Sequence, residues 1–300
     1  MAAFATISNV DRRHELTVSL EGKKARLEDY LLDAFPTVSK MYLRELVRDE
    51  RCEVNGRSEN IGYRLTPNDL IEIWIDPARG TAMVGEELNL DIVYEDEDLV
   101  VVNKAAGMLV HPSHREKRGT LLNGLVHHLN RQGGKLIRPG LVHRLDKDTS
   151  GLMVVAKNAR AHRILSRQFL KKQVAKRYRA VVEGLVADDE GTIVAPIDRH
   201  AEQKHWCVVA DGKYSETRHR VIERREDTTL MELEPVTGRT NQLRIHCEFI
   251  GHPIVGDTRR GGRQASRLYL HAAELSFQHV SSGEIMSFST PELFPILNAR

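Results

Sequence analysis

Residues 138–151 read R-P-G-L-V-H-R-L-D-K-D-T-S-G, and the apolar run L-M-V-V-A follows at residues 152–156. The apolar run predicts a buried strand. The polar loop before it is bounded by glycines and holds a carboxylate, Asp146, two residues after Arg144. Rigid scaffolds commonly present catalytic groups on loops of this kind. The stretch therefore predicts a core strand with a functional loop at its start.

The composition is that of a globular chain of about two domains. Of 300 residues, 41% are hydrophobic and 29% are charged, and no apolar run approaches the roughly 18 residues that a membrane helix needs. Residues 1–13 lack a basic region before an apolar core, so no secretory signal is expected. Cys52, Cys207 and Cys247 are widely spaced, a pattern that suits neither a disulfide framework nor a zinc site. A reducing, cytoplasmic location is expected.

Charge is divided unevenly along the chain. Residues 1–100 hold 12 Lys or Arg and 21 Asp or Glu, a net charge of −9, whereas the remainder holds 32 and 21, a net charge of +11. The densest block, residues 157–179, has nine basic residues and no acidic one. A solvated helix face explains a block of this length less well than a phosphate-bearing surface does. The partner is therefore expected to be a polyanion.

The N-terminal region predicts two helices followed by a small hairpin. Apolar residues at helical spacing predict a helix over residues 26–35, and Ser39 is the expected N-cap of a second helix. The dipeptide Asn55-Gly56 predicts a tight hairpin turn. Alternating isoleucines in residues 71–75 predict a strand with one buried face.

The rest of the chain predicts an α+β domain. Residues 77–88 are rich in glycine and small residues and are interpreted as a linker. Short strands then recur too closely for a regular βαβ alternation, which favours a mixed, largely antiparallel sheet. The strands are expected at residues 92–94, 99–103, 152–156, 178–182, 217–222 and 229–234, and the helices at 120–130, 159–171 and 240–250.

The loop sequence H-R-L-D-K-D-T-S-G closely resembles the signature of the RluA/RluD-type family of RNA pseudouridine synthases. In that family the Asp is the catalytic nucleophile, so the resemblance assigns this role to Asp146. It covers nearly all of residues 88–290 and implies a catalytic domain at residues 89–300. The isomerisation requires neither a cofactor nor a metal, and none is expected here.

The predicted N-terminal elements resemble a second module, the S4 RNA-binding domain. Two short helices followed by a hairpin with V-N-G at its turn carry this resemblance over residues 20–76, with residues 1–19 as an extension. A small α+β domain that merely stabilises the chain is the alternative, and local acidic residues favour it. The resemblance implies phosphate contacts from Lys40, Arg44, Arg48 and Arg51.

Two further motifs supply partners for Asp146. V-T-G-R-T-N-Q-L-R-I-H, at residues 236–246, resembles the family motif G-R-T-H-Q-L-R-[VI]-H, whose second Arg pairs with the catalytic Asp; this implies Arg244 as the partner. Burial alone would raise the pKa of a pocket carboxylate, and a neighbouring cation would oppose that shift. K-R-Y-R-A-V-V-E-G resembles the family strand whose Tyr lies against the flipped uracil, which implies that place for Tyr178.

The remaining site assignments concern contacts with RNA. The resemblance implies that Arg144 fills the gap left by the flipped nucleotide, and Arg163 and Arg239 are expected to bind phosphates. Asn241 replaces the His of the family motif, so it keeps a donor and an acceptor but cannot titrate. Together the expected substrate-binding residues are His143, Arg144, Thr149, Arg163, Arg239, Asn241, Lys40, Arg44 and Arg48.

Other loop elements of the family are present with changes. Ala105 stands where a Pro is usual, Arg260 where a Tyr is usual, and Val280 where a Pro is usual. These changes touch none of the proposed chemistry but favour an outlying member of the family.

Several alternatives accompany these predictions. An isolated Asp in a loop is often a turn cap, and the kinase H-R-D-L loop is excluded because Leu145 intervenes and no Gly-rich loop accompanies it. A non-catalytic RNA chaperone or ribosome-assembly factor on the same fold is one rival function. A hydrolase using Asp146 and Asp148 is another, although i and i+2 side chains of an extended loop point apart. The expected partner is structured RNA, ribosomal RNA in preference to transfer RNA, and the chain is expected to be a monomer.

Overall fold

The computed structural model describes residues 12–20, 24–35, 38–76, 84–113, 116–133, 137–200, 205–291 and 294. The chain forms two compact units, residues 1–85 with 126–138 and residues 86–125 with 139–300. Parts of the predicted extension (1–11) and linker (77–83) lie outside the described residues. Within the described ranges, no helix has the length and apolar character that crossing a membrane requires.

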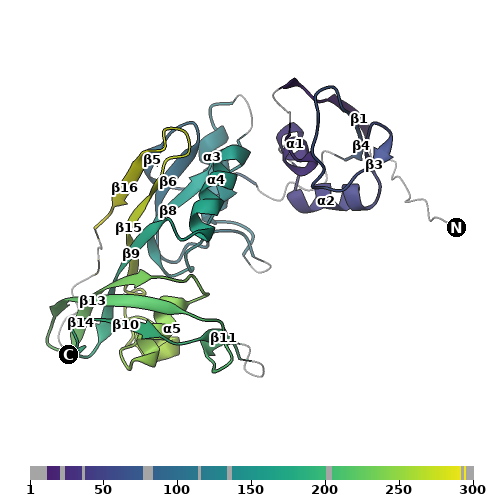
Figure 1. The fold of residues 1–300 in the computed structure, drawn as a ribbon. Helices are drawn as coiled ribbons and strands as arrows, with labels where there is room; N and C mark the ends of the chain where they lie inside the picture. The colour runs from purple at the N-terminus through teal and green to yellow at the C-terminus, as the bar shows by residue number, and fades with distance from the viewer. Residues whose placement is uncertain are drawn as a thin grey trace. The chain divides into compact units, whose positions relative to one another are not determined.

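The first unit packs two helices on one face of an antiparallel sheet with strand order β1-β4-β2-β3 (Figure 1). Ser39 Oγ accepts a hydrogen bond from Tyr42 N at 3.1 Å, which confirms the predicted N-cap. Asn55 and Gly56 have φ of 53° and 71°, as a tight hairpin turn requires. The elements are β1 Arg12–Thr17, α1 Leu27–Ala34, α2 Lys40–Arg48, β2 Cys52–Val54, β3 Arg57–Ser58 and β4 Leu70–Ile75.

The strand β1 falls in the region predicted to be an extension. It pairs with β4 over its six residues, from Arg12 opposite Ile75 to Thr17 opposite Leu70. Its sequence, R-R-H-E-L-T, is mostly polar, so the pairing depends on backbone hydrogen bonds at the edge of the sheet more than on apolar burial. Local composition therefore gave little signal for it.

The second unit is built on a ten-stranded mixed sheet with the order β10-β13-β14-β9-β15-β8-β6-β5, to which β7 and β16 are attached. Of the described strand pairs only β8 and β15 run parallel, which confirms the predicted α+β class and the largely antiparallel sheet. The elements are β5 Asp91–Glu95, β6 Leu99–Lys104, α3 Leu121–Asn130, β7 Gly140–Leu141, β8 Ser150–Ala156, α4 Ala159–Leu170, β9 Ala175–Glu183, β10 Glu190–Val194, β11 Ile197–Arg199, β12 Trp206–Val208, β13 Glu216–Arg224, β14 Thr228–Pro235, α5 Gln242–Phe249, the 3₁₀ helix η2 Thr258–Arg260, β15 Leu270–Gln278 and β16 Ile285–Ser289.

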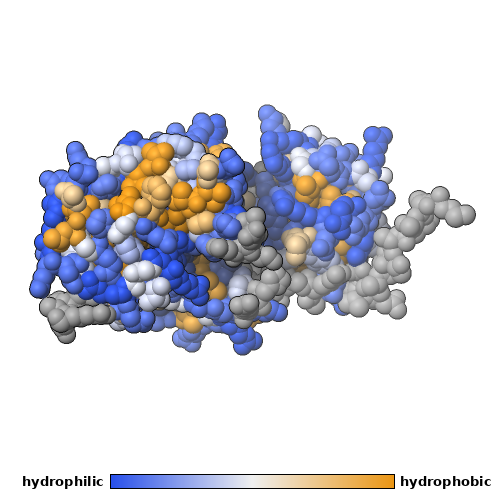
Figure 2. Space-filling model, turned by 90° about the horizontal axis from the view of Figure 1, so that it is seen from below, coloured by the Kyte–Doolittle hydropathy of each residue, from blue (hydrophilic) through white to orange (hydrophobic). Residues whose placement is uncertain are grey.

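The apolar run after the functional loop forms the centre of this sheet. All seven residues of β8 are buried, because α4 packs against one face of β6 and β8 and the first turns of α3 against the other. Strands covered on both faces are expected to be continuously apolar. α5 packs on β9 and β14 in a neighbouring cluster. On the face of the larger unit seen in Figure 2, hydrophilic residues surround one large hydrophobic patch and a few smaller hydrophobic areas.

Strand register brings the three predicted catalytic segments together. Gly151, at the start of β8, is opposite Ala272 of β15, and Ala272 is in turn opposite Tyr178 of β9. Tyr178 is also opposite Leu233 of β14, the strand that leads into the loop before α5. The loop with Asp146, the strand with Tyr178 and the helix with Arg244 thus meet across four neighbouring strands, β8, β15, β9 and β14, although they are far apart in sequence.

We expect Gly151→Ala to destabilise the protein by about 2–5 kcal/mol, because strain and overlap add. Gly151 has φ of +114°, and a Cβ there would lie 2.4 Å from the carbonyl oxygen of Ala272. Gly107→Ala is the matched control: it has φ of +80° but no atom within 4 Å of the added Cβ, so strain alone should cost about 1 kcal/mol. Denaturant unfolding of the two variants measures the difference, and equal losses would show that the β8–β15 contact tolerates a side chain.

Candidate active site

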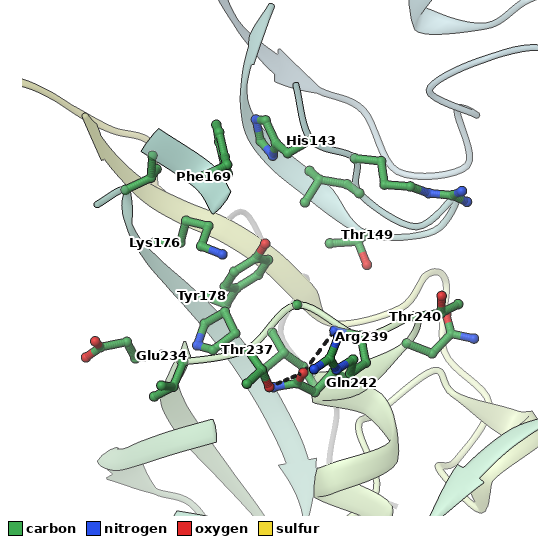
Figure 3. Close-up of a pocket in the computed structure, with 18 of the residues that line it drawn as sticks. His143, Thr149, Phe169, Lys176, Tyr178, Glu234, Thr237, Arg239, Thr240 and Gln242 are labelled. Carbon is green, nitrogen blue, oxygen red and sulfur yellow. Dashed lines mark hydrogen bonds between the residues drawn. The ribbon is translucent and has the colours of Figure 1, made fainter. Parts of the chain in front are cut away.

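A pocket of about 770 Å³ opens on the second unit, where the loop before β8, the end of α4, β9 and the loop before α5 converge (Figure 3). This volume lies in the range of pockets that hold small ligands and is sufficient for a nucleotide. Residues of the wall include Asp146, Tyr178 and Arg244, the three predicted catalytic residues. The pocket also contains His143, Arg144, Thr149, Arg239 and Asn241 from the predicted substrate-binding set.

Asp146 is partly buried and surrounded by donors. Arg244 Nη1 lies 3.9 Å from its Oδ2. In the amide orientation that satisfies both groups, Asn241 Nδ2 donates to Asp146 Oδ2 at 2.7 Å and lies 3.2 Å from Oδ1. Burial raises the pKa of Asp146, and the charges of Arg244, Arg144 and Lys104 oppose that rise. The opposing cations and the amide donor both favour the ionised form that a nucleophile requires.

Arg244 is fixed by a second carboxylate. Its Nε and Nη2 donate to Asp257 Oδ2 and Oδ1 at 2.6 and 2.8 Å, a bidentate pair in which Asp257 is buried. The third nitrogen of the Arg244 guanidinium, Nη1, therefore lies on the side nearest Asp146. Arg260, which stands where the family has a Tyr, pairs with Glu248 and donates to the Trp206 carbonyl at 2.9 Å. Glu248, four residues after Arg244 on α5, therefore pairs with Arg260 and not with Arg244.

Asn241 owes its position to an unusual backbone conformation. It precedes the first residue of α5 with φ of 56° and ψ of 20°, and its side chain makes no capping hydrogen bond. Asn is among the few residues that adopt this left-handed conformation readily. The amide is consequently free of the helix and available to Asp146. A contact with RNA was the predicted role, whereas the observed contact is with the carboxylate of Asp146.

Lys104 supports the backbone of the loop that holds Asp146. It is almost completely buried, and its Nζ donates to the carbonyls of Ala105, Met108 and Lys147 at 2.8, 2.9 and 3.0 Å. Burial lowers its pKa to about 8. Because Lys147 follows Asp146 directly, the bond to the Lys147 carbonyl fixes the backbone of the loop that holds Asp146 to β6.

The apolar side of the pocket is built around Tyr178. Burial, followed by the charge of Asp146, raises the pKa of its phenol, which is therefore neutral at physiological pH. His143 stacks on Phe169 with ring centroids 4.5 Å apart, and its Nε2 accepts from Val154 N at 3.0 Å. Burial lowers the pKa of His143 to about 3, so this residue is a neutral part of the wall. Thr149 is buried at the end of the loop.

The predicted phosphate contacts divide into three groups. Arg144 and Arg239 are exposed at the pocket, and Arg239 also donates to the Tyr214 carbonyl at 3.2 Å. Arg163 is exposed on α4 but does not line the pocket. In the first unit, Lys40 and Arg44 both pair with Glu28, and Arg48 pairs with Asp49.

Three supporting residues were missed as site residues by sequence reasoning. Lys104, Asp257 and Gln242 are all buried and polar, and each holds a segment of the pocket in place. Gln242 Oε1 accepts from Thr237 Oγ1 at 2.7 Å and from the Arg239 backbone N at 3.0 Å, which shapes the loop before α5 (Figure 3). In the sequence these residues stand in the dipeptides Asn103-Lys104, Gly256-Asp257 and Asn241-Gln242. A single sequence does not distinguish a buried polar residue from an exposed one.

Comparisons with known proteins identify a matching family and several relatives. Residues 98–249 match the family model described as RNA pseudouridylate synthase. The chain is 40% identical over 283 residues to an uncharacterized RNA pseudouridine synthase, YlyB, of Bacillus subtilis, covering 92% of this chain and 93% of the relative. It is 37% identical over 305 residues to ribosomal large subunit pseudouridine synthase D of Neisseria meningitidis serogroup B, covering 96% and 81%.

A solved structure is also similar to this chain. Human RNA pseudouridylate synthase domain containing 1 superposes with a TM-score of 0.60 at 31% identity, over 70% of this chain and 86% of that one. Fold, pocket and relatives agree, and the chain belongs to the RluA/RluD-type family of RNA pseudouridine synthases, isomerases that act on uridine in RNA.

Proposed function

We propose that this chain converts uridine to pseudouridine in large-subunit ribosomal RNA and that Asp146 is the nucleophile. The observation that carries the proposal is the arrangement around Asp146, which faces the pocket with Arg244 and Asn241 as its partners. The name of the Neisseria relative favours the large ribosomal subunit as the source of the RNA.

The reaction breaks the N1–C1′ bond of uridine and forms a C5–C1′ bond. An ionised carboxylate beside C1′ can attack that carbon, as in retaining glycosidases. Removal of the C2′ proton, which would leave a glycal, is the other route, and it also requires the anion. In either route C5 loses its proton when pseudouridine forms, and Tyr178, at the pocket wall, offers an aromatic face for the base.

The wider RNA contacts follow from exposed cations. Arg144 fills the stack after the target nucleotide has left it, and Arg239 binds phosphate at the rim of the pocket. We assign residues 20–76 to an S4-like RNA-binding domain and residues 89–300 to the catalytic domain. The protein acts as a monomer in the cytoplasm.

Tritium release from RNA labelled at uridine C5 tests this function. Unmodified large-subunit ribosomal RNA and unmodified transfer RNA are offered separately under single-turnover conditions. Release from the ribosomal RNA alone supports the proposal, whereas release from transfer RNA alone changes the substrate but not the chemistry. No release from either RNA would favour an assembly factor on the same fold.

We expect Asn241→Gly to lower the single-turnover rate constant by roughly 10–100-fold, because a hydrogen bond to a charged group contributes about 1.5–3 kcal/mol. Glycine is the suitable replacement, since it adopts the φ of 56° without strain and removes only the amide. Asn241→Asp should lose more activity, because it places a second carboxylate against Asp146. If the glycine variant kept its rate constant but bound RNA more weakly, the result would show that Asn241 contacts RNA, as the sequence predicted, and would contradict its role at Asp146.

A further inference from the structure

Lys176 lies on β9 two residues before Tyr178, so both side chains project from the same face of the strand (Figure 3). It lines the pocket and is half-buried beside the Phe169 ring, 6.0 Å from the ring centroid to Nζ. Within the described part of the chain its ammonium has neither a hydrogen bond nor an ion pair, whereas the next two cations of β9 are matched. Arg177 bonds to Glu274 at 3.1 Å and Arg179 pairs with Glu232.

An uncompensated ammonium in this position is costly. Burial lowers the pKa of Lys176, and among the residues that the structure describes no anionic neighbour opposes the shift. Protein interiors normally pair such charges, as they do here for Lys104 with three carbonyls and for Arg244 with Asp257. A cation held without a partner at a pocket wall is arranged for negative charge that arrives with the ligand or develops in the reaction.

Two groups of a bound uridine nucleotide are candidates for that charge: a phosphate and the base. Exposed cations at the pocket, Arg144, Lys172 and Arg239, are the natural phosphate contacts. Lys176 instead shares the face of β9 with Tyr178 and lies among the aromatic and apolar residues of the wall. His143 cannot supply positive charge there, because its pKa of about 3 keeps the ring neutral.

Resting on the proposed function, we infer that the Lys176 ammonium donates a hydrogen bond to a carbonyl oxygen of the target uracil and stabilises the uracil anion. When Asp146 bonds to C1′, the N1–C1′ electron pair leaves with the base, and its charge spreads over N1, O2 and O4. The base then turns, and C5 attacks C1′ and expels the carboxylate, which leaves a neutral adduct with hydrogen still on C5. C5 then loses its proton to water and N1 takes up a proton from water, which gives pseudouridine. Lys176 keeps its proton throughout, so its contribution is electrostatic and greatest while the base is detached.

The variant Lys176→Met tests whether Lys176 contacts the base or a phosphate of the bound nucleotide. With an RNA from which the unmodified protein releases tritium, we expect the single-turnover rate constant at saturating RNA to fall at least about 100-fold, the loss typical of removing one donor to a developing anion. The dissociation constant should stay within about threefold, and its dependence on salt should not change. Lys176→Arg, which keeps the charge, should recover most of the rate.

Two comparisons complete the experiment. Lys213→Met removes an equal charge from an exposed site outside the pocket and is expected to behave as the unmodified protein. The melting temperature of Lys176→Met should equal or exceed that of the unmodified protein, because a poorly solvated charge is removed; a clear decrease would indicate a structural role and contradict the inference.

Other results would overturn the inference in distinct ways. Lys176 would be identified as a phosphate ligand by three results together for Lys176→Met. The rate constant would be unchanged, RNA would bind more weakly, and the salt dependence of the RNA affinity would be shallower by about one phosphate contact. Unchanged rate and binding would leave the ammonium without a function in the reaction. Absence of tritium release by the unmodified protein on every RNA would instead contradict the proposed function, and the inference with it.

Discussion

Replacing Asp146 with Asn should reduce tritium release by at least about a thousandfold, because the variant has no anion to attack C1′ or to remove the C2′ proton. The substitution keeps the shape of the side chain. Asp146 makes no short ion pair, since Arg244 Nη1 is 3.9 Å from it, so the fold should be retained. The melting temperature is expected to be unchanged or higher, because burial opposes the charge at this position.

Asp148→Asn is the matched control for this variant. It removes the same charge from the same loop, but Asp148 is exposed and does not line the pocket. We expect its rate to stay within about threefold of the unmodified protein. A large loss in both variants would revive the hydrolase with two carboxylates, and activity of Asp146→Asn within tenfold of the unmodified protein would exclude Asp146 as the nucleophile.

Arg244→Met should give the second-largest loss, of roughly 100–1,000-fold in the single-turnover rate constant, because it removes a charge that favours the ionised form of Asp146. It should also shift the pH dependence. The pKa of Asp146 is raised by burial, and Arg244 is the first of the charges that oppose the rise. Without Arg244 that pKa rises further, so the carboxylate protonates at higher pH. The acid limb of the pH–rate profile should therefore move to higher pH, and a limb that does not move would contradict the pairing.

Loss of Arg244 also leaves Asp257 with only a distant ion-pair partner among the described residues, Arg260 Nε at 4.0 Å. This carboxylate is buried and bonded to the Arg244 guanidinium at 2.6 and 2.8 Å, so Arg244→Met should cost about 3–5 kcal/mol of unfolding free energy. The double variant Arg244→Met with Asp257→Asn should recover much of that stability, because the buried, poorly compensated carboxylate charge is gone. Its rate should remain low. Activity that returned together with stability would show that Arg244 acts through folding alone.

Local signals in the sequence predicted the elements whose conformation is decided locally. The Ser39 N-cap, the Asn55-Gly56 turn and the buried strand β8 depend on side chains within a few residues of one another. The central strand β15 was not predicted, because it mixes apolar and polar residues and obtains its burial from β8 and β9 on either side. Such burial is decided by pairing partners more than 80 residues away in the chain.

The candidate site likewise contains residues that the sequence predicted and contacts that it did not predict. Motif resemblance indicated Asp146, Tyr178 and Arg244, and the fold brings all three to one pocket. The contact from Asn241 to Asp146 and the support of Lys147 by Lys104 were not predictable, since each joins segments that only the folded sheet brings together. The unmatched charge of Lys176 likewise becomes visible only when every neighbour has been placed.

The nucleoside content of large-subunit ribosomal RNA after incubation with the protein tests the central claim most directly. Unmodified RNA is treated with the protein or with Asp146→Asn, digested to nucleosides and separated by chromatography. Isomerisation through Asp146 predicts pseudouridine in an amount equal to the uridine lost, no free uracil, and no change with the variant. Free uracil, or equal amounts of pseudouridine with the protein and the variant, would contradict it.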